Sequence, residues 1–178
     1  MSTRILTKGL RTGIGSGGVN FIIMRGLSSD LNPPDPSDVR LIIIAIVNQL
    51  KAISTTRGFF TDINSCVDDW RFKDVQMLEL PCIEVRDISE DIERHGGYDR
   101  RTLNVEIIGS IAITDMNDVR NFQQDIEAAM SDGGGPSYPD NVYISVMSSR
   151  GEIDINLINK KLATITLDYE VKYRTRVI

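Results

Sequence analysis

The sequence predicts an α+β fold in which two helices pack on one face of a four-stranded antiparallel or mixed sheet, preceded by an extended N-terminal arm. Two segments carry apolar residues at the three- and four-residue spacing of a helix, and four others have the apolar patterns of strands. The last strand keeps one face polar, as in a sheet that is open to solvent on one side. These two observations place the helices together on the other face.

The first residues of the chain differ from the rest in composition and charge. Residues 1–29 contain six glycines, four basic residues and no acidic residue. Their net charge is +4, and because the whole chain has a net charge of −5, residues 30–178 have a net charge of −9. A glycine-rich segment buries too little surface to offset the entropy of ordering it. Pro33, Pro34 and Pro36 are typical of a stiff hinge. We therefore predict an arm over residues 1–35 and a folded domain over residues 36–178.

The domain is expected to open with a helix over residues 38–53. Ser37 is suited to be its N-cap, and Asp38 favours the positive end of the helix dipole. The β-branched residues of 41–47 also fit a strand, but the length of the segment and its later polar residues favour a helix. Its middle is apolar nearly all round, and one sheet covers only one side of a helix. We therefore expect something else to cover the other side.

Residues 54–74 show no sustained period and are expected to form a long connection. A strand is predicted over residues 75–86, where Pro81 indicates a sheet edge or a bulge. Residues 87–99 are expected to be a polar loop, followed by a long strand from Leu103 to Ile113 with alternate apolar residues.

The second half of the domain repeats this order of elements. Thr114 or Asp115 is expected to cap a second helix, whose apolar stripe runs from Met116 to Met130 and which ends at the glycines before Pro136. Val142, Ile144 and Val146 indicate a third strand. The last strand alternates most clearly, and its inward residues are predicted to be Ala163, Ile165, Leu167, Tyr169, Val171 and Tyr173.

Composition excludes several classes of protein. The longest apolar run, Leu41–Val47, is far shorter than the roughly 20 residues of a membrane span, and no secretory leader is expected at Met1. The negative charge argues against a free-standing reader of nucleic acid. Cys66 and Cys82 cannot supply a four-thiolate zinc site or a disulfide framework, and both are expected to be reduced.

No pattern predicts a catalytic, cofactor or metal site. Residues 13–18 match G-x-G-x-x-G, but no helix pattern follows them to face a pyrophosphate, so a flexible arm is favoured. His95, the single histidine, has no adjacent nucleophile and is expected to be solvated. Asp87, Glu90, Asp91 and Glu93 lack the glycine turn of a calcium loop, so a solvated acidic face is favoured there.

The sequence has more apolar surface than one copy is expected to bury. We predict an interface between copies formed by two segments, and Val19–Met24 of the arm is expected to add as a strand to a neighbouring copy or to lie over it. The residues predicted at this interface are Phe21, Ile22, Ile23 and Met24 in the arm, and Leu41, Ile43, Ile44 and Val47 in the first helix.

From Ser37 onward the layout resembles the tail terminator, or tail-completion, proteins of tailed bacteriophages. The resemblance is one of pattern over about 140 residues, and residues 1–35 have no counterpart in it. It is carried by Leu41–Ala45, Leu80–Val85, Leu103–Gly109, Asp125–Met130 and Leu162–Val171.

The resemblance implies an α+β subunit without catalytic residues that forms a hexameric ring in the virion, at the junction of tail and neck, after synthesis in the host cytoplasm. Its implied partners are the tail tube protein, the sheath protein where a sheath exists, and a stopper or connector protein of the neck. The alternatives are that the chain is itself a stopper or head–tail connector, or that it is a metal-dependent enzyme using Asp and Glu groups.

A negatively charged body suits a channel through which DNA slides without specific binding. We therefore predict acidic side chains along the lumen of the ring. The candidates come from the polar loop and from the outer face of the last strand: Asp87, Glu90, Asp91, Glu93, Asp168 and Glu170.

Overall fold

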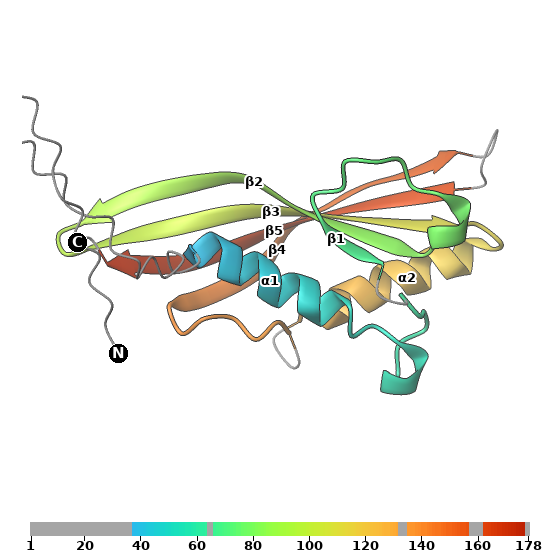
Figure 1. Cartoon of the computed structure of the whole chain (residues 1–178), viewed down its shortest axis with the longest axis horizontal. Coiled ribbons are helices and arrows are strands. Elements are labelled where there is room, and N and C mark those ends of the chain that lie inside the picture. The colour runs from blue at the N-terminus through green and yellow to red at the C-terminus, as the bar shows by residue number, and fades with distance from the viewer. Residues whose placement is uncertain (1–36, 64–65, 132–134, 157–161, 177–178) are drawn as a thin grey trace, which may run out of the picture. The chain divides into compact units, whose positions relative to one another are not determined.

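The computed structural model describes residues 37–63, 66–131, 135–156 and 162–176, apart from the side chains of residues 150–152. Contacts within the chain separate it into two units, Met1–Pro34 and Asp35–Ile178, and the described residues all belong to the second unit. The predicted arm therefore lies outside the described residues. Figure 1 shows the elements in chain order: α1 (Asp38–Leu50), β1 (Val67–Asp69), β2 (Cys82–His95), β3 (Tyr98–Ala112), α2 (Met116–Ala129), β4 (Val142–Asn156) and β5 (Leu162–Arg176).

The described strands form one mixed sheet in the order β1-β2-β3-β5-β4. β1 runs parallel to β2, and the other neighbours are antiparallel. Both helices lie on the same face of the sheet in Figure 1, so the predicted α+β class is confirmed. The predicted number of four strands is wrong, because β1 also joins the sheet. β1 has three residues, too few for a period of two to be visible in the sequence.

The loop predicted over residues 87–99 is wrong, because β2 and β3 form one long hairpin there. β2 continues to His95, the chain turns at Gly96 and Gly97, and β3 starts at Tyr98. Gly96 has φ +56°, the left-handed conformation that glycine adopts most easily. Most of the polar residues that β2 contributes to this segment are exposed, and each pairs with a residue on β3. Conversely, the strand predicted from residue 75 begins only at Cys82, after a 3₁₀ turn at Met77–Glu79.

The core lies between the sheet and the helices. β5 buries all six residues predicted to face inward, from Ala163 to Tyr173. The expectation that α1 needs a cover from outside its own domain is largely wrong, because the sheet, α2 and the connection after α1 enclose it in one core. The buried residues of α1 are Ile42, Ile43, Ala45, Ile46, Val47 and Leu50.

Both helices have the predicted N-caps. The Ser37 hydroxyl accepts a hydrogen bond from the Arg40 backbone N–H at 3.3 Å, and Asp115 forms a capping box with Asp118 at the start of α2. α2 lies so close to β3 that a Cβ at Gly109 would be 2.8 Å from the nearest side-chain atoms of both Phe122 and Ile126. Gly109 therefore sets the distance between α2 and the sheet.

Candidate functional site

The sheet has two edges where the structure places no further strand among the described residues. One is the outer edge of β4, and the other is formed by the outer side of β1 and by the part of β2 beyond the three residues that pair with β1. The exposed part of β2, residues 86–95, is rich in charged residues, which natural sheets use to discourage pairing with another chain. The first half of β4, Val142–Ser149, contains no charged residue. β4 is therefore the edge that is less protected against pairing.

β4 also presents apolar side chains beside a depression. Tyr143, Ile144 and Val146 are all exposed. The depression has a volume of about 450 Å³ and is lined by these residues together with the end of α2 and the loop after it, including Met130, Pro136 and Tyr138. The Tyr138 hydroxyl lies 2.9 Å from the Ser145 hydroxyl, which ties this loop to β4. Burial raises the pKa of Tyr138, so the phenol stays neutral at ordinary pH.

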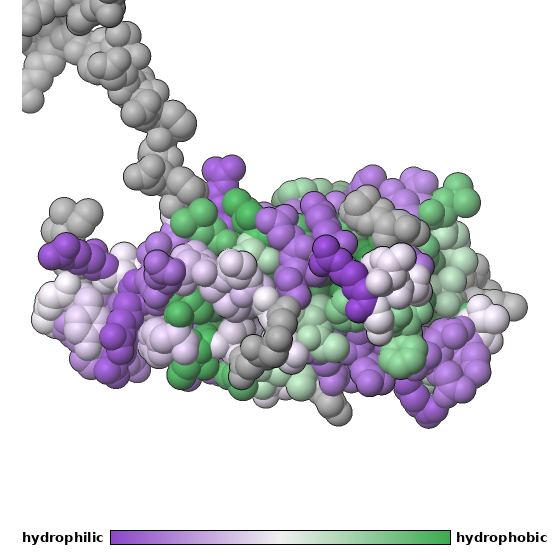
Figure 2. Space-filling model, turned by 90° about the horizontal axis from the view of Figure 1, so that it is seen from below, coloured by the Kyte–Doolittle hydropathy of each residue, from purple (hydrophilic) through white to green (hydrophobic). Residues whose placement is uncertain are grey.

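A second exposed apolar surface lies in the connection between β1 and β2, residues 70–81, at the opposite edge of the sheet. Phe72 is 92% exposed and Leu78 is 96% exposed, and Met77 beside it is also exposed. Side chains of this size, left in water by a folded domain, usually mark a contact with a partner. Hydrophobic surface is likewise distributed over several separate places on the helix side of the molecule, as Figure 2 shows.

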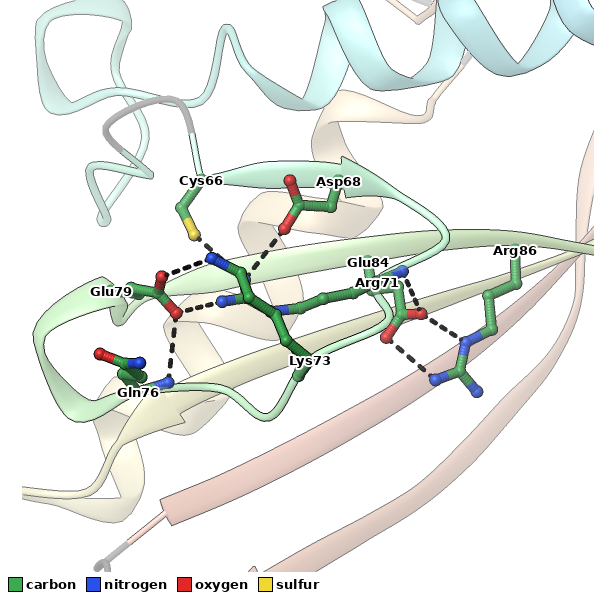
Figure 3. A network of polar contacts seen from close by, with 8 residues as sticks. All are labelled: Cys66, Asp68, Arg71, Lys73, Gln76, Glu79, Glu84 and Arg86. Atoms are coloured by element: carbon green, nitrogen blue, oxygen red, sulfur yellow. Dashed lines mark hydrogen bonds and ion pairs between the residues drawn. The ribbon is translucent and has the colours of Figure 1, made fainter.

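A network of charged groups fixes the path of this connection (Figure 3). Its centre is Arg71, whose side chain is only 4% exposed. The guanidinium donates to Asp68 at 3.0 Å and to Glu79, and it lies 3.6 Å from the Cys66 sulfur. The Arg71 backbone N–H donates to Glu84 at 2.8 Å. Arg71 therefore joins β1, the 3₁₀ turn and β2.

The carboxylates of the network are held by further donors. Glu79 accepts from the Gln76 backbone N–H at 3.2 Å and from Lys73 Nζ at 3.2 Å, and these bonds lower the pKa of Glu79. Glu84 accepts two hydrogen bonds from Arg86, at 2.8 and 2.9 Å. Burial would raise the pKa of Glu84, but the bonds from Arg86 and Arg71 outweigh it and lower that pKa. Both carboxylates are therefore ionised at neutral pH, and the network holds the connection in one conformation.

The two cysteines lie at the edge of this network. Cys66 and Cys82 are both free thiols, as the sequence analysis expects. Burial, and then the neighbouring Cys66, raise the pKa of Cys82 to about 12. Cys82 is therefore a neutral thiol in the protein and a poor nucleophile.

The structure brings four of the six predicted acidic residues to the open face of the sheet. On β2, Asp91 and Glu93 come after the bulge and point to this open face. On β5, Asp168 and Glu170 point to the same face. Asn104 on β3 links the two strands, because it lies opposite Glu170 and donates to Asp91 at 3.5 Å. Basic residues share the face, and Lys172 pairs with Glu170 at 3.4 Å.

The other two acidic candidates lie elsewhere. Glu90 points to the helix side, where it accepts hydrogen bonds from the Tyr173 hydroxyl and from Arg101 at 3.2 Å. Burial and the Glu90 carboxylate raise the pKa of Tyr173. Asp87 accepts a hydrogen bond from the indole of Trp70. Both carboxylates are therefore committed to contacts within the chain.

The residues predicted at the interface between copies have three different outcomes. Phe21, Ile22, Ile23 and Met24 lie outside the described residues. Ile43 and Val47 are buried in the core of the chain itself, so they present no surface to a neighbour in this conformation. Ile44 is 43% exposed and Leu41 is half-buried. Ile44 is thus the helical residue of this set with the most accessible side chain.

The sequence does not predict the two apolar surfaces on β4 and on residues 70–81. Val142, Ile144 and Val146 predict a strand, but their alternation does not tell an edge strand from a central one. Phe72 lies in the segment predicted as a connection and Leu78 in the segment predicted as a strand, and nothing in the sequence shows that Arg71 binds Glu79.

The remaining candidates have simple surroundings. His95 lies at the end of β2, stacks on Tyr98 with ring centroids 5.8 Å apart, and has Glu93 at 3.7 Å.

The glycine motif at residues 13–18 lies outside the described residues. Within the described ranges, the His, Cys, Asp and Glu side chains form no group of three or more arranged to hold a metal ion. No described helix is both long and apolar enough to span a membrane.

Comparison with known proteins gives a likeness of fold. No family model matches the sequence. No curated protein matches it either. Among solved structures, a chain from the "Virion of native gene transfer agent (GTA) particle" superposes with a TM-score of 0.57 and is 10% identical. The match covers 78% of this chain and 98% of that chain. The domain is therefore similar in fold to almost the whole of a chain found in a virion.

Proposed function

We propose that this protein is a structural, non-enzymatic subunit of a virion, and that it forms a ring of the tail terminator kind. The observation that carries the proposal is the fold that it shares with nearly the full length of a chain from a gene transfer agent virion. In this role the ring caps the tail tube, stops its polymerisation and offers a surface to the neck protein above it. The protein then resides at the junction of tail and neck.

The exposed surfaces of the domain support assembly into a ring. β4 forms one edge of the sheet, and residues 70–81 follow β1 at the other edge. The two surfaces differ, so an association that uses both is head-to-tail, and head-to-tail contacts generate a closed ring when the rotation between copies allows it. The Arg71 network supports such a contact, because a surface held in one conformation loses less entropy on binding.

The open face of the sheet supports a role around DNA. Asp91, Glu93, Asp168 and Glu170 share this face, and residues 30–178 carry a net charge of −9. Arg86, Arg100 and Lys172 share the face, so it is the net negative charge of the body that disfavours phosphate binding and lets DNA move past without being held. We propose that this face, rather than the predicted set that included Asp87 and Glu90, lines the lumen.

Light scattering and electron microscopy of the purified full-length protein test the proposal. We expect the molar mass of six copies and ring-shaped particles, and we expect added protein to stop the elongation of tail tubes in a polymerisation assay. A ring of twelve copies would indicate a connector instead. A protein that stays monomeric at high concentration and leaves tube length unchanged would contradict the proposal.

A further inference from the structure

We propose that residues Val19–Met24 of one copy pair, as an additional strand, with the outer edge of β4 in a neighbouring copy. The inference rests on the proposed function in one respect, which is that copies of the chain assemble. It goes further in naming the edge that accepts the arm and the residues that the arm contributes.

Among the described residues, the acceptor is the open edge whose first half carries no charged side chain. Added strands bind through backbone hydrogen bonds, so they need an edge with free N–H and C=O groups and without charged side chains that stay solvated there. Val142–Ser149 on β4 provides eight consecutive uncharged residues at such an edge. The open part of β2, residues 86–95, carries four acidic residues and two arginines. The β4 edge is long enough for the six residues of Val19–Met24.

The side chains of the two segments are complementary. In an added strand, Val19, Phe21 and Ile23 point to one side and Ile22 and Met24 to the other. β4 offers exposed apolar partners in Ile144 and Val146. The depression of about 450 Å³ beside this edge offers room for a further row of side chains. Pairing would therefore bury apolar groups that are exposed in a single copy.

Charge favours the body of a copy as the partner of the arm. Residues 1–29 carry four basic residues and no acidic one, whereas residues 30–178 carry −9. Asp140, which is exposed, precedes the start of β4, and Glu170 lies opposite Val146 on the adjacent strand. Arg25 follows Met24 directly, so the added strand would bring a positive charge to an edge that carries these carboxylates. Arms of like charge repel one another, so pairing of arm with arm is disfavoured.

The length of the arm allows it to reach a neighbour. Twelve residues lie between Met24 and Ser37, and the thirteen steps from one to the other span up to about 45 Å when extended. The strands β3 and β5, of 15 residues each, are about 50 Å long, so this reach is comparable with the longest dimension of the sheet and exceeds its shorter ones. The strand segment is therefore not confined to its own domain.

Disulfide trapping between differently tagged copies tests the pairing. In a Cys66→Ser, Cys82→Ser background, one copy carries Ile22→Cys and the other carries Ser145→Cys, and the assembled mixture is oxidised with oxidised glutathione. We expect a covalent product that contains both tags. The matched control replaces Ser145→Cys by Ser89→Cys, an exposed position at the charged edge of β2, and should give at least tenfold less product. Equal products at both positions would overturn the inference.

A double variant, Ile22→Cys with Ser145→Cys in one chain, separates pairing between copies from pairing within a copy. The proposal predicts that oxidation yields linked oligomers on a denaturing gel. Closure of the disulfide within single chains, without linked oligomers, would overturn it.

A charge placed at the edge gives an independent readout in the full-length protein. Val146 on β4 is 48% exposed and Ile92 on β2 is 49% exposed, so Val146→Lys and Ile92→Lys are matched in burial. We expect Val146→Lys to need at least tenfold more protein to form rings, and Ile92→Lys to behave as the unchanged protein. Rings unaffected by Val146→Lys would refute the pairing and leave the proposed function standing. A monomeric unchanged protein would instead refute the proposed function itself.

Discussion

Asp125 is a buried carboxylate that holds the connection after α1 onto α2. It is 2% exposed and accepts hydrogen bonds from the backbone N–H groups of Phe60 and Thr61 and from the Thr61 hydroxyl, the last at 2.6 Å. In the sequence, Asp125 stands beside the apolar stripe of the second helix and gives no sign of burial. Its partners lie more than sixty residues earlier, so only the tertiary structure shows its role.

Replacing Asp125 by Ala should destabilise the domain without changing its fold. The change leaves buried N–H groups without an acceptor, and hydrogen bonds to charged groups contribute about 1.5–3 kcal/mol each, so we expect the free energy of unfolding to fall by about 3 kcal/mol. Urea unfolding followed by circular dichroism measures this. Gln124→Ala, at an exposed position of the same helix, is the control and should change stability by less than about 0.5 kcal/mol. Equal stabilities of the two variants would contradict the role of Asp125.

The carboxylates of the Arg71 network predict a loss of stability in acid. Hydrogen bonds lower the pKa values of Glu79 and Glu84 below the unfolded value of 4.5. At acidic pH the unfolded chain therefore binds more protons than the folded one. The two carboxylates make their full contribution to the free energy of unfolding above pH 4.5, and this contribution is lost as the pH drops through their folded pKa values. Unfolding at a series of pH values from 7 to 3 should show this fall. It should be shallower in Glu84→Gln, and an identical slope would contradict the contribution of Glu84.

At the scale of elements, alternation and apolar spacing predicted α2, β3 and β5 well. These elements have one buried face and one polar face, so their period is visible in the sequence. The prediction for the second half of β2 was wrong because beyond Asp87 most of the strand is exposed to solvent on both faces, and a polar strand has the composition of a loop. The bulge between Asp87 and Ser89 also breaks the alternation.

The close packing of α2 on β3 predicts the effect of a single methyl group. Gly109→Ala places a Cβ 2.8 Å from buried side-chain atoms of Phe122 and Ile126, so the helix must move away from the sheet. We expect a loss of about 2 kcal/mol, as for other overpacked cores. Gly97→Ala is the matched control, because no heavy atom lies within 4 Å of its Cβ. Thermal unfolding of both variants decides the matter, and a fully stable Gly109→Ala would show that α2 is less tightly packed.

At the scale of the whole molecule, the domain buries more of its own apolar surface than its sequence indicates. The chain covers α1 except on the side of Arg40, Ile44 and Asn48, so association of copies is not required to cover most of it. The apolar side chains that remain exposed among the described residues include those of β4, those of residues 70–81, and Ile44, with Phe60, Ile88, Ile92 and Met116 at separate places. The expected interface therefore moves from the helix to the two edges of the sheet.

Deletion of residues 2–30 should abolish the ring while leaving the domain folded. The deletion removes Val19–Met24 and all four basic residues of the first 29, and with them the strand and the charge that we propose to join copies. Light scattering should give the mass of a single copy, and circular dichroism should show an unchanged domain. A truncated protein that keeps the full molar mass would show that the arm is not needed for assembly.

Charge reversal on the open face of the sheet tests the proposed lumen. Asp91→Lys together with Glu93→Lys should leave rings intact but slow the passage of DNA, because lysines would hold the phosphates. Asp91→Asn with Glu93→Gln is the neutral control and should have a smaller effect. Infectivity or gene transfer by assembled particles is the measurement, and normal delivery after charge reversal would remove this face from the lumen.

The sequence by itself determined the α+β class, both helices with their caps, and the inward residues of β5, because each depends on neighbours within a few positions along the chain. Only the tertiary structure decided that β1 joins the sheet, that α1 is covered from within, that β4 is an edge, and that Arg71 binds Glu79. These features depend on which distant segments meet, and a residue carries the same local pattern whether its partner is solvent or another strand.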